Sequence, residues 1–105
     1  MFIILQTGTF RHWESKFKDK RARTLIATRV FRSANGLAGD VEPVGEGISE
    51  LRIHYGPGYR IYFQQTGEPT LLLINGGNKQ TQANDIALAK LLAKNWTGTV
   101  EIDDE

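Results

Sequence analysis

The stretch from Glu50 to Phe63 alternates apolar and polar residues on both sides of a Gly-Pro-Gly break. Alternation with a period of two around a Gly/Pro turn is typical of a β-hairpin, so strands are expected over 48–55 and 59–65. Pro57 suits an early position of the turn, and the glycines beside it can adopt positive φ. One face of the hairpin would be aliphatic and aromatic, and the other would carry Arg52, His54, Arg60 and Tyr62. Most polar strand faces only meet water, but this set of donors is suited to binding phosphate.

The residues before the hairpin predict one strand followed by two helices. Residues 2–6 form the expected strand, and Thr9 is a suitable N-cap for a helix that begins at Phe10. Asp19 is expected to cap a second helix that runs to about residue 33. The first helix is expected to bury a stripe of aromatic residues at i, i+3 and i+7: Phe10, Trp13 and Phe17.

The remaining segments predict the class of the fold. Residues 41–47 contain Pro and Gly and are expected to form a loop. Residues 70–75 are almost wholly apolar, which predicts a central strand, and a helix is expected over 81–95. The order predicts a single α+β domain, residues 1–97, followed by an acidic tail, residues 98–105. Its parts are an N-terminal strand, a helical hairpin, a three-stranded mainly antiparallel sheet and a C-terminal helix, with helices on one face and the other face partly open.

The composition excludes several kinds of site. The chain has no cysteine, so it forms neither disulfides nor a thiolate metal site. Its two histidines have no carboxylate pattern around them, and no metal or other cofactor is expected. The apolar start of the chain is too short to span a membrane, and a soluble cytoplasmic protein is expected.

The basic residues are concentrated in one part of the chain. Thirteen Lys and Arg face twelve acids overall, but four of those acids lie in the last five residues. Residues 11–32 hold eight basic residues and only two acidic ones. Such a cluster suits a polyanion partner. The alternative is a solvated helix face, which charge alone favours.

The polar residues that remain point to RNA chemistry. No phosphate-binding loop and no serine-nucleophile motif are present. Cleavage of RNA needs no external nucleophile, because the ribose 2′-OH can attack the adjacent phosphate. Arg and Lys can stabilise the charge on that phosphate, and His or Tyr can transfer protons. The alternative is structural: Tyr59 and Tyr62 would pack the sheet, and Arg52 would pair with Glu50 or Glu46.

Several motifs together resemble a known family of toxins. They are residues 50–63 and 71–82, Asp85-Ile86-x-x-Ala89, Phe10-x-x-Trp13, Asp19-x-x-Ala22-Arg23 and Gly36-x-x-Gly39-Asp40. This combination resembles the HigB-like, phage-derived addiction module killer protein branch of the RelE/ParE superfamily of type II toxins, over nearly the whole chain from Phe10 to Trp96. The resemblance implies an mRNA endonuclease that acts at the ribosome and inhibits translation. It also implies a cognate antitoxin, expected to be a helix-turn-helix protein encoded next to it.

The resemblance assigns roles to single residues. Arg60 matches the sheet arginine that contacts the scissile phosphate, and Lys79 matches the cation that stabilises the transition state. Arg52 falls near a basic position on the preceding strand, and His54 lies on the same face. The ribonuclease members carry a tyrosine or histidine near the start of the last helix, where this chain has residues 82–85. Either His54 or Asp85 could therefore be the proton acceptor. Asp85 could instead have a structural role, as a negative charge that interacts favourably with the N-terminus of the last helix.

The residues expected to contact RNA or the ribosome are basic or amide side chains and one phenol: Lys16, Lys18, Lys20, Arg21, Arg23, Tyr62, Gln80 and Gln82. Two other functions are left open by the missing tyrosine or histidine. One is a ParE-like toxin that inhibits DNA gyrase. The other is a non-catalytic module that binds RNA or a protein partner.

Overall fold

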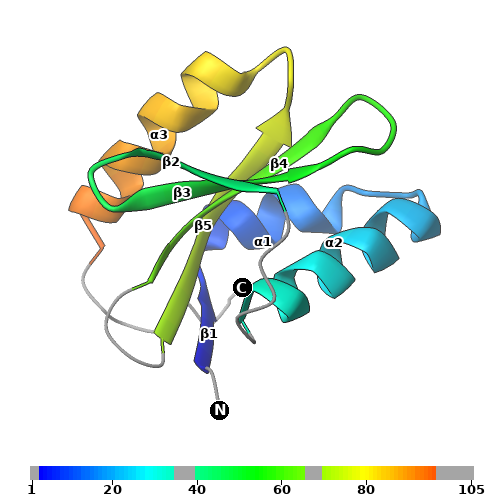
Figure 1. Cartoon of the computed structure of the whole chain (residues 1–105), viewed down its shortest axis with the longest axis horizontal. Helices are drawn as coiled ribbons and strands as arrows, with labels where there is room; N and C mark the ends of the chain where they lie inside the picture. The colour runs from blue at the N-terminus through cyan, green and yellow to red at the C-terminus, as the bar shows by residue number, and fades with distance from the viewer. Residues whose placement is uncertain (1–2, 35–39, 66–69, 97–105) are drawn as a thin grey trace.

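A twisted sheet separates the helices into two layers in the computed structural model, which describes residues 3–34, 40–65 and 70–96 (Figure 1). Within these ranges the sheet has five strands in the order β1-β5-β4-β3-β2. β1 is parallel to β5, and the other neighbours are antiparallel. The elements in chain order are β1 (Ile3–Gln6), α1 (Gly8–Ser15), α2 (Lys20–Ala34), β2 (Val41–Gly45), β3 (Ile48–Ile53), β4 (Tyr59–Gln65), β5 (Thr70–Asn78) and α3 (Gln82–Lys94). The expected acidic tail, 98–105, lies outside the described residues.

The expectation that residues 41–47 form a loop and that the sheet has three strands is wrong. Residues 41–45 form β2, which pairs with β3 at the edge of the sheet. Val41 packs on one side of the sheet and Val44 on the other, and this packing orders the segment. Pro43 is tolerated because an edge strand leaves one row of backbone groups unpaired, and the register shifts beside it.

Helices cover both faces of the sheet, which corrects the expectation of helices on one face only (Figure 1). The cause lies in β5, whose consecutive apolar residues point alternately to the two sides. Leu71 and Leu73 belong to the cluster under α1 and α2, whereas Leu72 and Ile74 pack with Ala89 of α3. A strand that is apolar on both sides must be covered on both sides.

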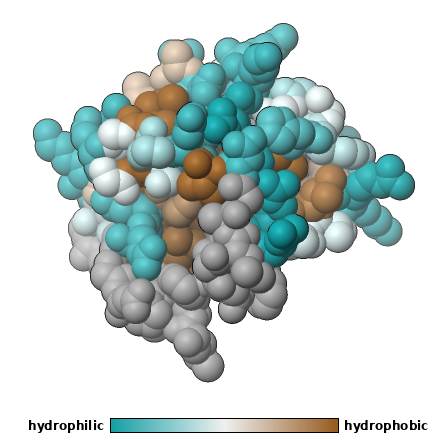
Figure 2. Space-filling view, in the orientation of Figure 1, coloured by the Kyte–Doolittle hydropathy of each residue, from teal (hydrophilic) through white to brown (hydrophobic). Residues whose placement is uncertain are grey.

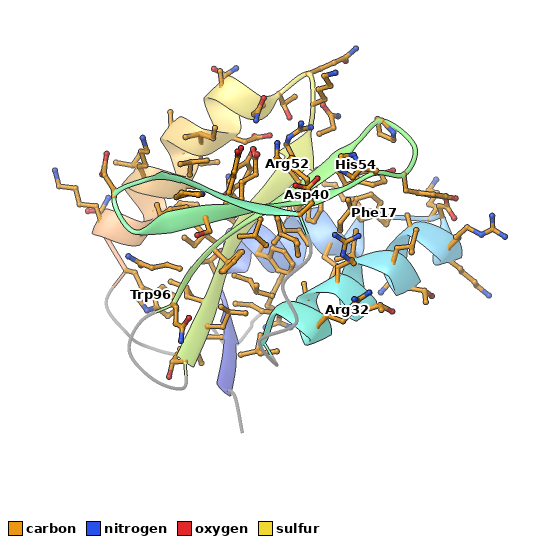
Figure 3. All side chains as sticks on the ribbon, viewed as in Figure 1. Phe17, Arg32, Asp40, Arg52, His54 and Trp96 are labelled. Atoms are coloured by element: carbon orange, nitrogen blue, oxygen red, sulfur yellow. The ribbon has the colours of Figure 1, made fainter. Side chains whose placement is uncertain are left out.

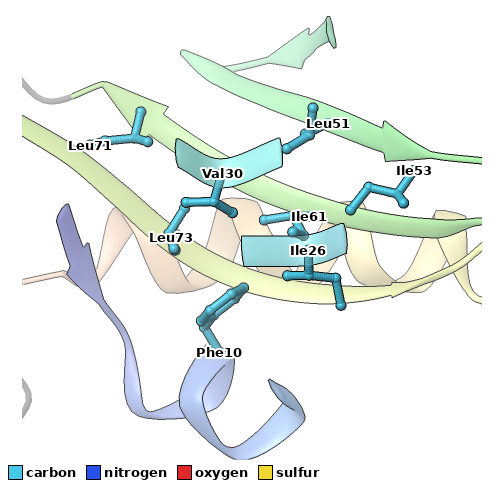
Figure 4. Close-up of a cluster of buried hydrophobic side chains, with 8 residues drawn as sticks. All are labelled: Phe10, Ile26, Val30, Leu51, Ile53, Ile61, Leu71 and Leu73. Carbon is cyan, nitrogen blue, oxygen red and sulfur yellow. The ribbon is translucent and has the colours of Figure 1, made fainter. Parts of the chain in front are cut away.

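The larger core lies under α1 and α2. Its buried side chains come from both helices and from β3, β4 and β5 (Figure 4): Phe10, Ile26, Val30, Leu51, Ile53, Ile61, Leu71 and Leu73. The expected aromatic stripe is confirmed, because Trp13 and Phe17 pack against this cluster. The α3 face has a smaller cluster of Ile48, Tyr62, Leu72, Ile74 and Ala89.

The sequence predicted the N-cap of α2 correctly but not the N-cap of α1. Asp19 caps α2 as expected, accepting hydrogen bonds from the backbone N–H of Arg21 at 2.9 Å and of Ala22 at 3.4 Å. The cap of α1 is Thr7, not Thr9, so α1 begins at Gly8. The Thr7 hydroxyl accepts from the Phe10 N–H and also donates to the Ile74 carbonyl of β5. Thr7 is preferred because it joins the helix to the sheet.

The β3–β4 hairpin forms as the alternation predicts, with a longer turn. β3 ends at Ile53, so residues 54–58 lie outside the strands. Gly56 and Gly58 adopt φ of 58° and 80°, and the Gly58 N–H donates to the Tyr55 carbonyl at 3.1 Å. The Tyr55 hydroxyl donates to Asp19 at 3.1 Å, which fixes the turn to the start of α2.

The surface seen in Figure 2 is mainly hydrophilic, with hydrophobic residues in separate patches between hydrophilic ones. Exposed large apolar side chains include Leu88 and Leu91 of α3. None of the helices in the described ranges combines the length and apolarity that a membrane span requires.

Candidate phosphate-binding site

Polar side chains from β3 and β4 gather on the α3 face of the sheet: Glu50, Arg52, Arg60 and Tyr62. The strand register brings them together, because Glu50 lies opposite Tyr62 and Arg52 lies opposite Arg60. Residues that are opposite one another, or two apart on one strand, project from the same face. The expectation that Arg52, Arg60 and Tyr62 share a face is therefore confirmed.

Glu50 is the centre of this group. Its side chain is only 2% exposed, and Oε2 accepts hydrogen bonds from the Tyr62 hydroxyl at 3.0 Å and the Gln82 amide at 2.8 Å. The Nε atoms of Arg60 and Arg52 lie 3.4 and 3.9 Å from its carboxylate oxygens. These two N–H groups are within ion-pair distance but have no hydrogen bond to the described residues. A buried carboxylate needs such partners, so Glu50 fixes the positions of the side chains around it.

Tyr62 is wholly buried, so the expectation that its phenol lies on an open RNA-binding surface is wrong. Alternation in β4 places Tyr62 on the polar face, but α3 covers that face at this point. Burial, followed by the hydrogen bond to Glu50, raises the pKa of Tyr62 far above its usual range. The phenol therefore stays protonated at neutral pH and acts as a donor to Glu50.

The Arg60 guanidinium and the Cβ of Lys79 both lie close to Gly58 at the end of the hairpin. A Cβ placed on Gly58 would lie 3.6 Å from Arg60 Nη1 and 3.7 Å from Lys79 Cβ. Arg60 Nη1 donates to the Gly58 carbonyl at 3.1 Å, and the side chain is 11% exposed. The Lys79 side chain is exposed and makes no ion pair with the described residues. Glu50 holds the Nε edge of Arg60, and the Nη edge lies toward the Gly58 carbonyl.

Arg52 and His54 are joined by Asp40, as the labelled side chains in Figure 3 show. Arg52 Nη2 lies 3.1 Å from Asp40 Oδ1 and 3.0 Å from Glu42 Oε1, so three carboxylates surround this guanidinium. The other Asp40 oxygen is hydrogen bonded to the exposed His54 ring. The hydrogen bond from His54, with the charge of Arg52, lowers the pKa of Asp40.

The start of α3 is attached to the sheet beside Arg60. Gly77, which lies opposite Arg60 in the register, leaves the space that the Asp85 carboxylate fills. That carboxylate accepts a hydrogen bond from Thr81, the N-cap residue of α3. Of the two glutamines expected to contact RNA, Gln82 is partly buried with its amide directed to Glu50, whereas Gln80 is exposed.

The basic residues expected to contact RNA or the ribosome are exposed but lie with α1 and α2: Lys16, Lys18, Lys20, Arg21 and Arg23. Those helices cover the opposite face of the sheet from Arg60 (Figure 1). The structure therefore separates the expected site into two surfaces, one around Arg60 and Lys79 and one on the helical hairpin.

The sequence did not single out Glu50 or Asp40 as site residues. The signal for Glu50 was present, because Glu50 and Arg52 are two apart on one strand and so share a face. Asp40 had no such local signal. It reaches Arg52 through the pairing of β2 with β3, which the expected loop at 41–47 concealed.

Known proteins resemble this chain in sequence or in fold. No family model matches the chain. A chain of the intact E. coli RelBE toxin–antitoxin complex superposes with a TM-score of 0.64 at 11% identity, covering 74% of this chain and 96% of that chain. At that identity the likeness concerns the fold alone, and it confirms the expected RelE-like α+β fold.

The sequence relationship extends over most of both chains. An uncharacterized protein of Haemophilus influenzae is 45% identical over 91 residues, which are 87% of this chain and 92% of that protein. Identity at this level over nearly the whole length indicates common descent and a shared fold. The chain therefore belongs to the same family as this uncharacterized Haemophilus influenzae protein, and its fold is RelE-like.

Proposed function

We propose that this protein is the toxin of a type II toxin–antitoxin module, a HigB-like member of the RelE/ParE superfamily. Its activity is that of an endoribonuclease that cleaves mRNA at the ribosome and so inhibits translation. The fold shared with a chain of the RelBE toxin–antitoxin complex supports the toxin class. The proposal is carried by Arg60, whose guanidinium lies beside Gly58, and by Lys79, whose Cβ lies beside the same glycine, so that its flexible side chain can bring the ammonium group to a phosphate held there.

The reaction is an attack of the ribose 2′ oxygen on the adjacent phosphorus, which breaks the bond from phosphorus to the 5′ oxygen. The products are a 2′,3′-cyclic phosphate and a 5′-hydroxyl. Arg60 and Lys79 would neutralise the charge that develops on the non-bridging oxygens. Glu50 occupies the Nε edge of Arg60, so the phosphate would meet the Nη edge beside Lys79.

Proton transfer requires a group to accept the 2′-OH proton and a group to donate one to the 5′ oxygen. His54 is exposed and its ring is oriented by Asp40, and histidine is the side chain that most often serves in general acid–base catalysis. Asp85 is the second candidate, although its carboxylate is hydrogen bonded to Thr81. Tyr62 is not a base, since its raised pKa keeps it protonated. We assign proton transfer to His54 and leave Asp85 to anchor α3.

Arg52 has a smaller role than Arg60 in this scheme. Asp40, Glu42 and Glu50 already neutralise its guanidinium, so a phosphate would have to compete with three carboxylates. Arg52 is accordingly a positioning residue, which holds Asp40 and through it His54.

Two partners complete the proposal. The exposed basic residues just before and at the start of α2, Lys18, Lys20, Arg21 and Arg23, form a surface suited to ribosomal RNA. The second partner is a cognate antitoxin, a helix-turn-helix protein encoded beside this gene, which would neutralise the toxin in the cytoplasm.

The test is to induce the protein in growing cells and to map the 5′ ends of mRNA within minutes. New ends within translated regions are expected, and Arg60→Ala or Lys79→Ala should strongly reduce them while the circular dichroism spectrum is retained. Lys94→Ala, an exposed lysine at the far end of α3, is the matched control and should cleave normally. Intact transcripts with double-strand DNA breaks would indicate a gyrase inhibitor instead. Normal growth would contradict any toxin.

A further inference from the structure

A cleft of about 340 Å³ opens on the α1/α2 side, at the end of the sheet where the hairpin turns. Three aromatic rings line it: Trp13, Phe17 and Tyr59. The Phe17 ring stands at 89° to Trp13 and at 85° to Tyr59, with centroid distances of 4.8 and 4.9 Å. All three side chains are only partly buried, so the rings support one another and still face the cleft.

The Trp13 ring is held firmly against the sheet. A Cβ placed on Gly76 would lie 2.5 to 2.6 Å from three atoms of the indole, so the backbone of β5 lies directly against the ring. Further along β5, residues 77–78 form part of the cleft wall. The aromatic wall is therefore fixed before any ligand arrives, which lowers the cost of ordering it on binding.

The charges around the cleft suit an anion. Lys16 lies in the wall, and none of the described residues that line the cleft is acidic. Lys16 also makes no ion pair with the described part of the chain. An apolar segment of a protein partner could pack against the three rings, but it would carry no negative charge to pair with Lys16. A ligand that joins a flat ring to a phosphate can stack on the aromatic wall and also pair with Lys16.

The cleft adjoins Gly58, the residue near which Arg60 and Lys79 both lie. Pro57 lines the cleft, and the next residue, Gly58, lies beside the Arg60 guanidinium and the Lys79 Cβ. Asn78 also lines it, and the next residue is Lys79. Consecutive Cα atoms are about 3.8 Å apart, so the two places are separated by the rim of the sheet and not by the body of the molecule.

We propose that this cleft binds an unpaired base of the same RNA strand whose phosphate is held by Arg60 and Lys79. Aromatic rings stack on any base through its π face, and a lysine beside them meets the flanking phosphate. The strand would pass over the rim at Gly58, with its phosphate on the α3 side and a neighbouring base among the rings. Because this assignment rests on the proposed RNA cleavage, its test must separate loss of the base contact from loss of the phosphate contact.

The test compares two strands of equal length and charge. One is a single-stranded 2′-O-methyl RNA, which is not cleaved because its 2′ oxygen cannot attack, and the other is the same backbone without bases. Fluorescence anisotropy of an end label gives the affinity of the full-length protein for each. The wild-type protein should prefer the strand with bases by about ten-fold, the size expected for one or two stacked bases. Phe17→Leu and Tyr59→Leu should each remove most of that preference.

The matched control is Phe63→Leu, which changes an aromatic residue on the same side of the sheet that does not line the cleft. It should keep the preference. A second measurement does not depend on the folding of a cleft variant. In a Trp96→Phe protein, the strand with bases should quench the remaining Trp13 emission, and the strand without bases should not.

Four other results would contradict the proposal that the cleft binds an RNA base. Equal affinity of the wild-type protein for the two strands would overturn it and leave the phosphate site standing. A preference that survives in both Phe17→Leu and Tyr59→Leu would place the base elsewhere. If those variants also escaped neutralisation by the antitoxin, the cleft would belong to a protein partner. Failure of either strand to bind would remove the proposed function together with the base site.

Discussion

The α1/α2 face of the sheet carries one cluster of eight buried apolar residues, whereas the α3 face is divided between a smaller apolar cluster and the polar group around Glu50. Both faces are built from alternate residues of the same strands, such as Ile61 on one side and Tyr62 on the other. The first face therefore contributes more of the buried apolar packing. The second face combines apolar packing with a buried carboxylate and with Arg60 at its rim.

Removing Phe10 should weaken the first face most. Phe10 is wholly buried in its cluster, and Phe10→Ala should lower the free energy of unfolding by about 3–5 kcal/mol. Urea unfolding followed by circular dichroism measures this. The control is Leu91→Ala on α3, where the side chain is 56% exposed and the expected change is within about 0.5 kcal/mol. Similar losses in the two variants would mean that the α1/α2 face does not dominate stability.

Removing Glu50 should show what the polar group contributes. Glu50→Ala leaves the Tyr62 hydroxyl and the Gln82 amide without their acceptor and leaves Arg60 without its counter-charge, at a cost of about 3 kcal/mol. Glu50→Gln keeps an acceptor oxygen and should cost less. Unfolding in urea and the rate of mRNA cleavage are measured together, and both should fall. An alanine variant with unchanged stability would contradict the central position given to Glu50.

Two neighbouring glycines allow the faces to be compared directly. Gly76→Ala places a methyl group against the rigid Trp13 ring on the α1/α2 side, and overpacking of this kind costs about 1–3 kcal/mol. Gly77→Ala meets the Asp85 side chain on the α3 side, which can rotate away at the loss of its bond to Thr81. Gly76→Ala should therefore have the lower midpoint in urea. The reverse order would show that α3 is held more rigidly than α1.

The smallest effect is expected where the hairpin turn meets α2. The hydrogen bond from Tyr55 is the main cause that lowers the pKa of Asp19 from its ordinary value of 3.8. A carboxyl with a lowered pKa stabilises the folded state above its unfolded pKa, and this contribution is lost as the pH falls through the folded value. Asp19→Ala should therefore be less stable than the wild type at pH 7, with a smaller difference at pH 3. Thermal unfolding at the two pH values measures it, and a difference that grows with acid would be contrary to this account.

Local signals predicted the parts of the fold that depend on neighbours in sequence. The glycines of the hairpin turn, the Asp19 cap and the apolar run of β5 were all recognised from short patterns. Thr9 was expected to cap α1, but Thr7 has the same capping chemistry and is the residue that caps the helix. The hydrogen bond from Thr7 to the carbonyl of Ile74, 67 residues away, decides between them.

Contacts that are distant in sequence account for what was missed in the site. Alternation places Tyr62 and Arg60 on one face but does not say that α3 covers the first and leaves the second at the rim. Likewise Asp40 and Glu42 reach Arg52 only after β2 pairs with β3, across a segment whose Pro and Gly are typical of a loop. The residue types indicated a site for phosphate. The pairing of the strands determined which cations are already neutralised by carboxylates, as Arg52 is.

The most direct measurement is a double-mutant cycle on the rate of mRNA cleavage at the ribosome, using Arg60→Lys and Lys79→Ala. If both cations hold one phosphate, each substitution should slow cleavage by about ten- to a hundred-fold. The double variant should then lose clearly less than the product of the two single losses, because groups that share a partner are coupled. Independent, multiplicative losses, or a Lys79→Ala protein that cleaves normally, would contradict a shared phosphate site at Gly58.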